Sequence, residues 1–362
     1  MTTALLAGGG TAGHVNPLLA VADRWRGENP DDTVIVLGTA EGLEARLVPA
    51  RGFELLTIAK LPFPRRLNSA TLRFPGQFRA AVREVRTIIT ERRVDIVVGF
   101  GGYAAAPAYV AARLERLPIV AHEANARPGF ANRLAALLGA SIGTTFSGTR
   151  LRGSRVVGMP LRPEIAGLDR RALRAEALQH FGLSGDQPVL LVTGGSTGAR
   201  RLNDTTTASA ARILGSGWQV LHLTGTGRGG DDPGIPGYVT LEYCDRMDLA
   251  FSAAELVVCR AGSATVSELA AIGLPAILVP YAVGNGEQRL NARDLVAAGA
   301  ALVVDDADFS PEWVASDLVP MLTGRARIAR MAAAASTMPR RDGASELLTL
   351  VREALAARER VG

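Results

Sequence analysis

Twice along this chain, a short apolar run leads directly into a glycine-rich turn and then into a segment of helical length. Thr3–Ala7 precedes the turn Gly8–His14, and Val189–Thr193 precedes the turn Gly194–Ala199. Each pattern predicts a buried strand that returns as a helix, because glycine lets the backbone turn tightly and approach a ligand. A strand–turn–helix unit of this kind opens a parallel, doubly wound α/β sheet, so we expect two such sheets.

Apolar runs and helical segments alternate after each turn, which supports this fold class. In the first half, strands are predicted at Thr3–Ala7, Thr33–Leu37, Glu54–Ile58, Ile96–Val98 and Ile119–Ala121, with helices at Pro17–Arg26, Leu43–Ala50, Arg79–Glu91 and Ala131–Leu138. In the second half, a helix is predicted from about Ala199, with strands at Val189–Thr193, Trp218–Thr224, Leu256–Cys259, Ala276–Val279 and Ala301–Val304.

The length of 362 residues suits two domains better than one core. The segment Gly158–Asp169 contains two prolines and is expected to be a hinge. We therefore predict an N-terminal domain over 1–161 and a C-terminal domain over 162–339, both Rossmann-like, facing each other across a cleft. The final helix, about Ala344–Ala357 within 340–358, is compatible with either domain, including a return to the first.

The net charge and the cysteine content indicate which partners and which cellular compartment suit this protein. A net charge of +5 favours anionic partners such as phosphorylated substrates, nucleic acid or anionic lipid. Cys244 and Cys259 are the only cysteines and lack a metal or redox spacing, which favours a reducing compartment. The N-terminus leads into a predicted strand instead of a secretory leader, and no run reaches the roughly 18–20 apolar residues of a membrane span. We expect a soluble or peripheral protein.

The two glycine turns are candidate phosphate sites, because N–H groups at a helix start favour bound anions. Three glycines of the first turn also fit the dinucleotide fingerprint GxGxxG. A dinucleotide site needs a carboxylate at the end of the second strand, and Leu37–Thr39 has none, which disfavours a nicotinamide-dependent oxidoreductase. The second turn adds the hydroxyls of Ser196 and Thr197 but no Walker lysine. A tight connection without a ligand is the alternative for either turn.

Two further strand ends carry candidate site residues. Gly99–Tyr103 follows a predicted strand, where the carboxyl edge of a sheet opens. Arg260–Glu268 follows another and places Glu268 about one turn into the next helix. A carboxylate at that position can accept hydrogen bonds from both hydroxyls of a ribose. The alternative is a capping box formed by Ser263 or Thr265 with Glu268.

These four elements, in this order, resemble those of the MurG family. The resemblance extends over nearly the whole chain and includes Gly9–His14 with Asn16–Pro17, Gly99–Tyr103, His122–Asn125, Pro160–Arg162, Gly194–Arg200, Cys259–Glu268 and Glu287–Gln288 with Asn291–Ala292. It implies a GT-B fold and an inverting hexosyltransferase. The implied reaction moves N-acetylglucosamine from UDP-N-acetylglucosamine to undecaprenyl-diphosphate-linked N-acetylmuramyl pentapeptide, which converts lipid I to lipid II in peptidoglycan synthesis. The sequence departs from the family pattern at Ala12, Ala124, Met159 and Glu287.

The resemblance also implies roles for individual residues. His14 is the expected general base for the muramyl 4-hydroxyl, because imidazole titrates near neutral pH, and a hydrogen bond to the donor diphosphate is its alternative role. The residues expected to bind the donor are Thr11, Ala12, Gly13, Asn125, Arg162, Ser196, Cys244, Ser263, Ala264, Thr265, Val266, Ser267, Glu268, Gln288 and Asn291. The candidates for binding the acceptor or its diphosphate are Gly101, Gly102, Tyr103, His122 and Glu123.

This scheme requires no metal and no cofactor. Asp306–Asp308 spells the DxD motif that another transferase class uses to hold a divalent cation. It precedes Ser310–Pro311 at a predicted helix start, so we predict a helix-capping role instead. His180 and His222 are expected to be structural.

A basic segment with interspersed apolar residues, Lys60–Arg93, is the predicted membrane contact. Its key members are Phe63, Arg73, Phe74, Phe78, Arg79 and Arg83. Basic and aromatic side chains together suit anionic headgroups and shallow insertion, whereas a solvated basic helix or a nucleic-acid patch is the alternative. We expect a peripheral protein on the cytoplasmic face of the cell membrane that binds anionic inner-leaflet lipids and no nucleic acid. The oligomeric state stays open.

Two other functions are alternatives to the MurG-type transfer reaction. Another GT-B glycosyltransferase with a lipid or natural-product acceptor is the nearest, because acceptor choice depends on loops of the first domain. A non-catalytic nucleotide-binding protein is disfavoured, because His14, Asn125, Arg162 and Glu268 are all present.

Overall fold

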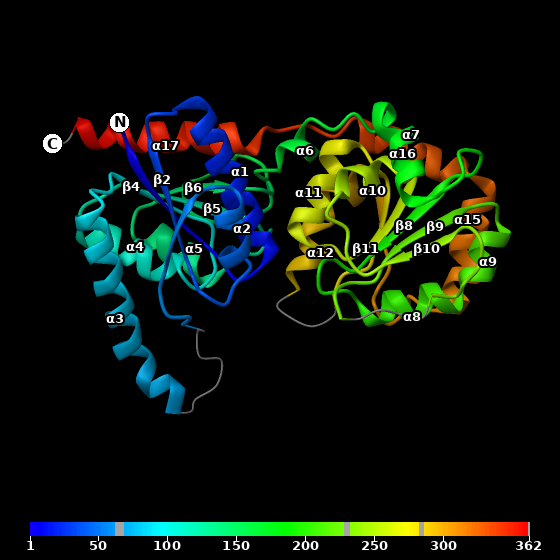
Figure 1. The fold of residues 1–362 in the computed structure, drawn as a ribbon, viewed down its shortest axis with the longest axis horizontal. Helices are drawn as coiled ribbons and strands as arrows, with labels where there is room; N and C mark the ends of the chain where they lie inside the picture. Colours follow the sequence, from blue (N-terminus) through cyan, green and yellow to red (C-terminus); the bar gives the residue numbers. More distant parts are fainter. Residues whose placement is uncertain (62–68, 228–231, 282–285, 361–362) are drawn as a thin grey trace. The chain divides into compact units, whose positions relative to one another are not determined.

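The computed structural model describes residues 1–61, 69–227, 232–281 and 286–360. The chain forms two compact units (Figure 1). Unit 1 comprises Met1–Arg162 together with Arg341–Gly362, and unit 2 comprises Pro163–Arg340. Each unit is a parallel sheet with helices on both faces, so the predicted α/β class with two parallel sheets is confirmed.

In unit 1, the described residues form a seven-stranded parallel sheet of order β3-β2-β1-β4-β5-β6-β7. Its strands are β1 (Thr3–Ala7), β2 (Thr33–Gly38), β3 (Glu54–Thr57), β4 (Ile96–Gly99), β5 (Ile119–Glu123), β6 (Ser141–Thr144) and β7 (Ser154–Val156). Its helices are α1 (Ala12–Glu28), α2 (Glu44–Ala50), α3 (Ser69–Glu91), α4 (Ala105–Leu114), α5 (Phe130–Leu137) and α17 (Gly343–Glu359).

Alternate residues of the central strand β1 face the two helical layers of unit 1. Leu5 and Ala7 lie in the apolar cluster that contains residues of α3, α4 and α5. Ala4 and Leu6 lie in the cluster that contains residues of α1, α2 and α17. All four are fully buried, as expected for a strand covered on both faces.

In unit 2, the described residues form a six-stranded parallel sheet of order β10-β9-β8-β11-β12-β13. Its strands are β8 (Val189–Thr193), β9 (Gln219–Leu223), β10 (Tyr238–Leu241), β11 (Leu256–Cys259), β12 (Ala276–Leu278) and β13 (Ala301–Val303). The helices before β12 are α6 (Pro163–Ala166), α7 (Arg170–Phe181), α8 (Arg200–Ala208), α9 (Ala210–Gly215), α10 (Met247–Ala253) and α11 (Ser263–Ile272). Those after it are α12 (Glu287–Asn291), α13 (Arg293–Ala297), α14 (Pro311–Trp313), the π-helix η1 (Val314–Leu318), α15 (Val319–Gly324) and α16 (Ala326–Ser336).

Two helix starts differ from the prediction. Helix α1 begins at Ala12 and not at Pro17, and α3 begins at Ser69 and not at Arg79. Each helix contains a proline near its start, which removes a single backbone hydrogen bond there and does not end the helix. Strands β6, β7 and β10, helix α4 and most helices of unit 2 were not predicted. Phe63, part of the predicted membrane segment, lies outside the described residues.

Candidate functional site

Both glycine turns leave their sheets where the strand order reverses. In unit 1, β1 lies between β2 and β4, and in unit 2, β8 lies between β9 and β11. Connections from two such neighbouring strands run to opposite faces of the sheet and leave a crevice at the carboxyl ends. Gly8–His14 follows β1 and Gly194–Ala199 follows β8, so each turn lies at the switch point of its own sheet.

In unit 1, the turn after β1 packs backbone to backbone against the loop after β4. A Cβ atom on Gly102 would lie 2.4 Å from the Gly9 carbonyl oxygen. Gly10, Gly101 and Gly102 also have φ values of +91°, +87° and +81°, which L side chains rarely adopt. The glycines are therefore required for the contact between the loops, whatever ligand the site binds.

His14 lies in the first turn of α1, beside these loops. Thr11 is the N-cap residue, and its hydroxyl lies 3.2 Å from His14 Nδ1. Burial lowers the pKa of His14, and a hydrogen bond to the Gly9 backbone and the charge of Glu44 offset this only in part. The imidazole is therefore neutral at pH 7 and can accept a proton.

The carboxylate of Glu44, which no sequence pattern indicated, supports the same turn. Glu44 is fully buried at the start of α2. It accepts hydrogen bonds from the backbone N–H of Gly10 at 2.8 Å, the N–H of Thr39 at 2.9 Å and the Thr39 hydroxyl at 2.8 Å. Burial raises the pKa of Glu44, but these hydrogen bonds more than compensate and lower it, so the group is ionised.

The residues after β5 form a buried hydrogen-bond network. Glu123 accepts from the backbone N–H groups of Asn125 and Gly129, both at 2.9 Å, and from Asn132 Nδ2 at 3.0 Å. These bonds hold the loop that presents the half-buried Asn125. The Asn132 side chain also accepts from the Tyr109 hydroxyl at 2.8 Å, which anchors the network on α4. Burial raises the pKa of Glu123.

The predicted acceptor candidate His122 has no exposed surface. Its Nε2–H donates to the Gly158 carbonyl at 2.9 Å. Burial lowers the pKa of His122 to about 4, so the ring is neutral. Gly101, Gly102 and Tyr103, by contrast, lie in the loop beside His14, and the Lys60 ammonium lies 5.5 Å from the centre of the Tyr103 ring.

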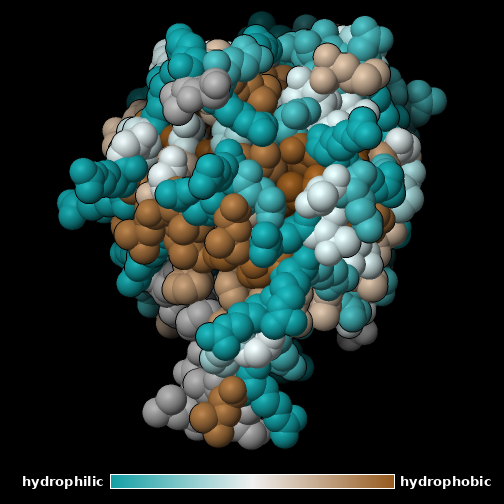
Figure 2. Space-filling view, turned by 90° about the vertical axis from the view of Figure 1, so that its left-hand side faces the viewer, coloured by the Kyte–Doolittle hydropathy of each residue, from teal (hydrophilic) through white to brown (hydrophobic). Residues whose placement is uncertain are grey.

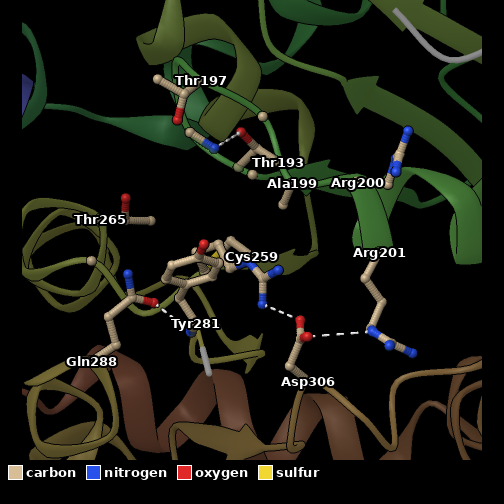
Figure 3. A pocket seen from close by; sticks show the side chains of 15 residues that line it. Thr193, Thr197, Ala199, Arg200, Arg201, Cys259, Thr265, Tyr281, Gln288 and Asp306 are labelled. Atoms are coloured by element: carbon tan, nitrogen blue, oxygen red, sulfur yellow. Dashed lines mark hydrogen bonds and ion pairs between the residues drawn. The ribbon is translucent and has the colours of Figure 1, made fainter. Parts of the chain in front are cut away.

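Unit 2 contains a cavity of about 610 Å³ at the switch point of its sheet (Figure 3). The turn after β8, the end of β11 and the starts of α11 and α12 all contribute to its wall. Its lining residues are Thr193, Gly194, Gly195, Thr197, Gly198, Ala199, Arg200, Arg201, Cys259, Arg260, Gly262, Thr265, Tyr281, Gln288 and Asp306. The exposed Ser196 lies on the same turn.

The buried side chains of Asn203, His222 and Tyr238 form a hydrogen-bonded chain that holds the glycine turn of the cavity in place. Gly198 approaches the backbone of Thr224 so closely that a Cβ atom would lie 2.1 Å from the Thr224 oxygen. Asn203 Nδ2 donates to this same oxygen at 2.9 Å. His222 Nε2–H donates to Asn203 Oδ1 at 3.2 Å, and His222 Nδ1 accepts from the Tyr238 hydroxyl at 2.7 Å. His222 is thus structural, and burial lowers its pKa to about 4.

Asp306 pairs with two arginines of the cavity wall, so its predicted helix-capping role is wrong. One oxygen lies 2.5 Å from Arg260 Nη1, and the other lies 3.3 Å from Arg201 Nε (Figure 3). Arg260 also donates to the Val279 carbonyl at 3.1 Å. The helix start is capped by Ser310 instead, whose side chain accepts from the backbone N–H of Trp313. A partner distant in sequence thus overrides the local capping pattern.

The start of α11 places Glu268 as predicted, within the second turn of the helix. The N-cap residue is Gly262, so neither Ser263 nor Thr265 occupies the N-cap position that the alternative capping box requires. Thr265 lines the cavity, Ser263 is buried, and the remaining predicted residues Ala264, Val266 and Ser267 lie on the same helix.

The other predicted donor contacts differ in exposure. Gln288 lines the cavity, and its Oε1 accepts from the Tyr281 N–H at 2.9 Å. Asn291 is fully buried and donates to the Ala261 carbonyl at 3.3 Å. Cys244 is half-buried on the loop between β10 and α10, and Arg162 is half-buried at the last residue before unit 2.

Helix α3 carries most of the described part of the predicted membrane segment, and α4 and α5 add further exposed apolar side chains. Arg73, Arg79 and Arg83 are exposed on α3, and the rings of Phe74 and Phe78 stack with their centres 5.8 Å apart. Figure 2 shows hydrophobic side chains gathered on this side of unit 1 beside α3. The exposed large apolar side chains on these three helices are Leu72, Leu114, Phe130 and Leu137. The last three lie outside the predicted segment Lys60–Arg93.

Comparison with known proteins gives consistent matches to both units. The glycosyltransferase family 28 N-terminal domain matches residues 4–143, and the C-terminal domain of that family matches residues 189–347. A Leifsonia xyli subsp. xyli protein named UDP-N-acetylglucosamine–N-acetylmuramyl-(pentapeptide) pyrophosphoryl-undecaprenol N-acetylglucosamine transferase is 60% identical over 99% of this chain and 100% of its own. A Clavibacter sepedonicus protein of the same name is 59% identical over 99% of this chain and 98% of its own. The crystal structure of Acinetobacter baumannii MurG matches with a TM-score of 0.79 and 28% identity, covering 98% of this chain and 100% of that one.

Proposed function

This chain belongs to the MurG family within glycosyltransferase family 28, and from that premise we propose how its residues carry out the reaction. The enzyme transfers N-acetylglucosamine from UDP-N-acetylglucosamine to the muramyl pentapeptide on undecaprenyl diphosphate, the lipid I to lipid II step of peptidoglycan synthesis. One observation carries the assignment of the donor to unit 2. Its cavity of about 610 Å³ combines a glycine turn, a helix start and arginines, which together suit a nucleotide diphosphate.

In the proposed reaction, His14 acts as the general base. The muramyl 4-hydroxyl attacks the anomeric carbon of the donor sugar, and its proton passes to the imidazole. The bond between the anomeric carbon and the diphosphate breaks, and UDP leaves with the electron pair, so a single displacement inverts the configuration. The lowered pKa of His14 supports this role, because the base must be neutral before the attack.

Donor binding is assigned chiefly to groups of unit 2. The N–H groups of the turn after β8 and the hydroxyls of Ser196 and Thr197 would bind the diphosphate, and the family resemblance implies that Arg162, the last residue of unit 1, adds a positive charge. Glu268 would accept hydrogen bonds from both ribose hydroxyls, and the chain around Cys244 would lie along the uracil. Gln288 would bind the sugar through its amide nitrogen, because its oxygen is already bonded to Tyr281.

Three buried residues of the predicted site are better suited to positioning than to direct contact. His122, Glu123 and Asn291 are 0%, 3% and 0% exposed, and each bonds to backbone groups of a neighbouring loop. We assign to them the placement of the loops that carry Asn125 and the start of α11. Asn125 itself remains the candidate for contact with the acceptor or the transferred sugar.

We propose that the exposed face of α3, α4 and α5 contacts the cytoplasmic leaflet of the cell membrane. The acceptor carries an undecaprenyl chain, so the enzyme must reach a lipid surface. Exposed arginines suit anionic headgroups, and the exposed leucines and Phe130 suit shallow insertion. Among the residues that the structure describes, no helix has both the length and the apolar character needed to cross a membrane.

The test is UDP release from UDP-N-acetylglucosamine with and without a lipid I analogue, in three variants. We expect His14→Ala to lower kcat by roughly 10²- to 10⁴-fold with little change in donor affinity. Glu268→Ala should raise the donor Kd by roughly ten- to a hundredfold, because hydrogen bonds to a charged group are lost. The exposed Glu312, at the start of α14, provides the control variant Glu312→Ala. A His14→Ala enzyme with full turnover would remove His14 as the base.

A further inference from the structure

Three glycines surround the side chain of Glu44 and leave room for it. Cβ atoms on Gly9, Gly38 and Gly42 would lie 2.2 Å, 2.6 Å and 2.0 Å from atoms of Glu44. Unlike Gly10 and Gly101, none of these three has a positive φ among the described glycines. Backbone conformation therefore does not explain the three glycines, whereas space for the carboxylate does.

This carboxylate is an unusual choice for a purely structural residue. A fully buried charge is expensive unless several hydrogen bonds hold it. Glu44 has three such bonds, and two of them come from the backbone N–H groups of Gly10 and Thr39. Gly10 lies in the turn after β1, and Thr39 follows β2, so Glu44 ties the two strand ends together. The turn that it fixes leads directly into the helix start that carries His14.

We propose that Glu44 is a positioning residue for the transfer reaction: its buried carboxylate fixes the turn before His14 and keeps a negative charge near the imidazole while the imidazole takes up the proton of the acceptor. This inference rests on the proposed role of His14 as base. No proton moves to Glu44 itself. The acceptor proton passes to His14, and the carboxylate stabilises the resulting imidazolium across the turn.

The electrostatics around His14 support this assignment. The titratable and charged groups near the ring are Glu44 on α2, His122 on β5 and, beside Gly10, Tyr103 with the Lys60 ammonium over its ring. The neutral His122 supplies no negative charge, and Lys60 is a cation. Glu44 is the group whose charge raises the pKa of His14 against burial. Removing that charge should lower the pKa of His14 and weaken it as a base.

Two substitutions test the proposal in different ways. Glu44→Gln removes the charge and keeps the size of the side chain. Gly42→Ala keeps the charge and displaces the carboxylate, because the new methyl group would occupy its place. Gly27→Ala, at a helical glycine with no atom within 4 Å of the added Cβ, is the matched control. The full-length enzyme is used throughout, and thermal melts establish that each variant is folded.

The first readout is the His14 pKa, measured by NMR titration of the imidazole signals and assigned with His14→Ala. We expect a downward shift in Glu44→Gln, a smaller one in Gly42→Ala and none in Gly27→Ala, because the charge of Glu44 raises the pKa against burial. The second readout is the pH profile of kcat, whose acidic limb should move to lower pH by the same amount. At pH 7, where His14 is already neutral, kcat should fall several-fold in Glu44→Gln because the imidazole is a weaker base, with the KM for the donor unchanged within a factor of two.

The outcomes separate this inference from the proposed base. An unchanged His14 pKa in folded Glu44→Gln, or in Gly42→Ala if the first variant does not fold, overturns the role of Glu44. A shifted His14 pKa with unchanged kcat and pH profile overturns it as well. Full activity of His14→Ala overturns the base assignment, whereas the NMR titration still reports whether Glu44 acts on His14.

Discussion

Two histidines, one in each unit, are buried as neutral side chains and make stability depend on pH. Burial lowers the pKa of His122 and of His222 to about 4 in the folded protein. An unfolded histidine keeps a pKa near 6.5, so between pH 6.5 and 4 the unfolded state binds more protons. Stability is therefore full above pH 6.5 and falls as the pH drops through this window.

We expect each of these histidines to remove about 3 kcal/mol from the free energy of unfolding between pH 6.5 and pH 4. Urea denaturation at several pH values measures this loss. His222→Asn should flatten the pH dependence of unit 2, whereas His180→Asn, at an exposed position on α7, should not. Equal effects of the two substitutions would contradict the assignment.

Single residues of the site were predictable where a local pattern determines their place. Glu268 follows a strand end and a glycine at a helix start, and the structure places it in the second helical turn. Glu44 and Asp306 were not predictable as site residues. Their partners Gly10 and Arg260 lie 34 and 46 residues away in the sequence, and no local spacing reports such contacts. Both acquire their role only when strand ends meet at a sheet edge.

Within the turn after β8, two glycines have the same sign of φ but different surroundings. Gly198 has φ +66° and would place a Cβ atom 2.1 Å from the Thr224 oxygen, whereas Gly195 has φ +83° and nothing within 4 Å. Gly195→Ala should cost about 1 kcal/mol for its backbone conformation alone. Gly198→Ala should cost about 3 kcal/mol or more, because backbone must move as well.

Chemical denaturation of the two glycine variants measures this contrast, and calorimetry with UDP adds a functional readout. A displaced turn in Gly198→Ala should also weaken UDP binding, while Gly195→Ala should retain most of it. If the two variants lose the same stability, the close approach of Gly198 to Thr224 does not constrain the turn.

Helix α3 gives a separate prediction for membrane contact. Reversing the charge at Arg73, Arg79 and Arg83 should weaken binding to anionic vesicles by more than a hundredfold, since each basic residue near such a surface contributes about 1 kcal/mol. Turnover of a soluble acceptor should stay near its original value. Arg92, directly after the end of this helix, already pairs with Glu54, so Arg92→Glu is the control. Unchanged co-sedimentation of the triple variant with vesicles would refute the contact.

Most strands were predictable because their apolar pattern is continuous. Strands β1, β8 and β11 match the prediction residue for residue, since each is a buried run that ends at a glycine or polar turn. The missed strands β7 and β10 are short and lie at the edges of their sheets, where fewer side chains are buried. Edge strands depend on pairing with a neighbour, which the local sequence does not encode.

The two units share the strand order of a Rossmann sheet, but one is built from a continuous segment of the chain and the other from two segments. Unit 2 is the continuous segment Pro163–Arg340, whereas unit 1 also needs Arg341–Gly362. Helix α17 contributes Leu347, Leu348 and Val351 to the apolar cluster of unit 1, all at most 2% exposed. The sequence could predict α17 but not its unit, because an apolar helical face does not specify its partner.

We therefore expect the fragment 163–340 to fold alone and the fragment 1–340 to lose the fold of unit 1. The first fragment keeps its own core and its cavity, so it should unfold cooperatively and bind UDP. The second exposes the surface that α17 covers, and its heat-unfolding transition for unit 1 should be absent. Calorimetry and circular dichroism measure both. Cooperative unfolding of unit 1 in the fragment 1–340 would show that α17 is dispensable.

The return of α17 to unit 1 also sets an order of events during translation. Residues 341–362 leave the ribosome after all of unit 2, so the segment that is synthesised second is the first able to finish its core. Until then, residues 1–162 expose the apolar surface that α17 later covers, and chaperones can bind this surface. A stalled or prematurely terminated nascent chain would release a finished nucleotide-binding half joined to an unfinished one.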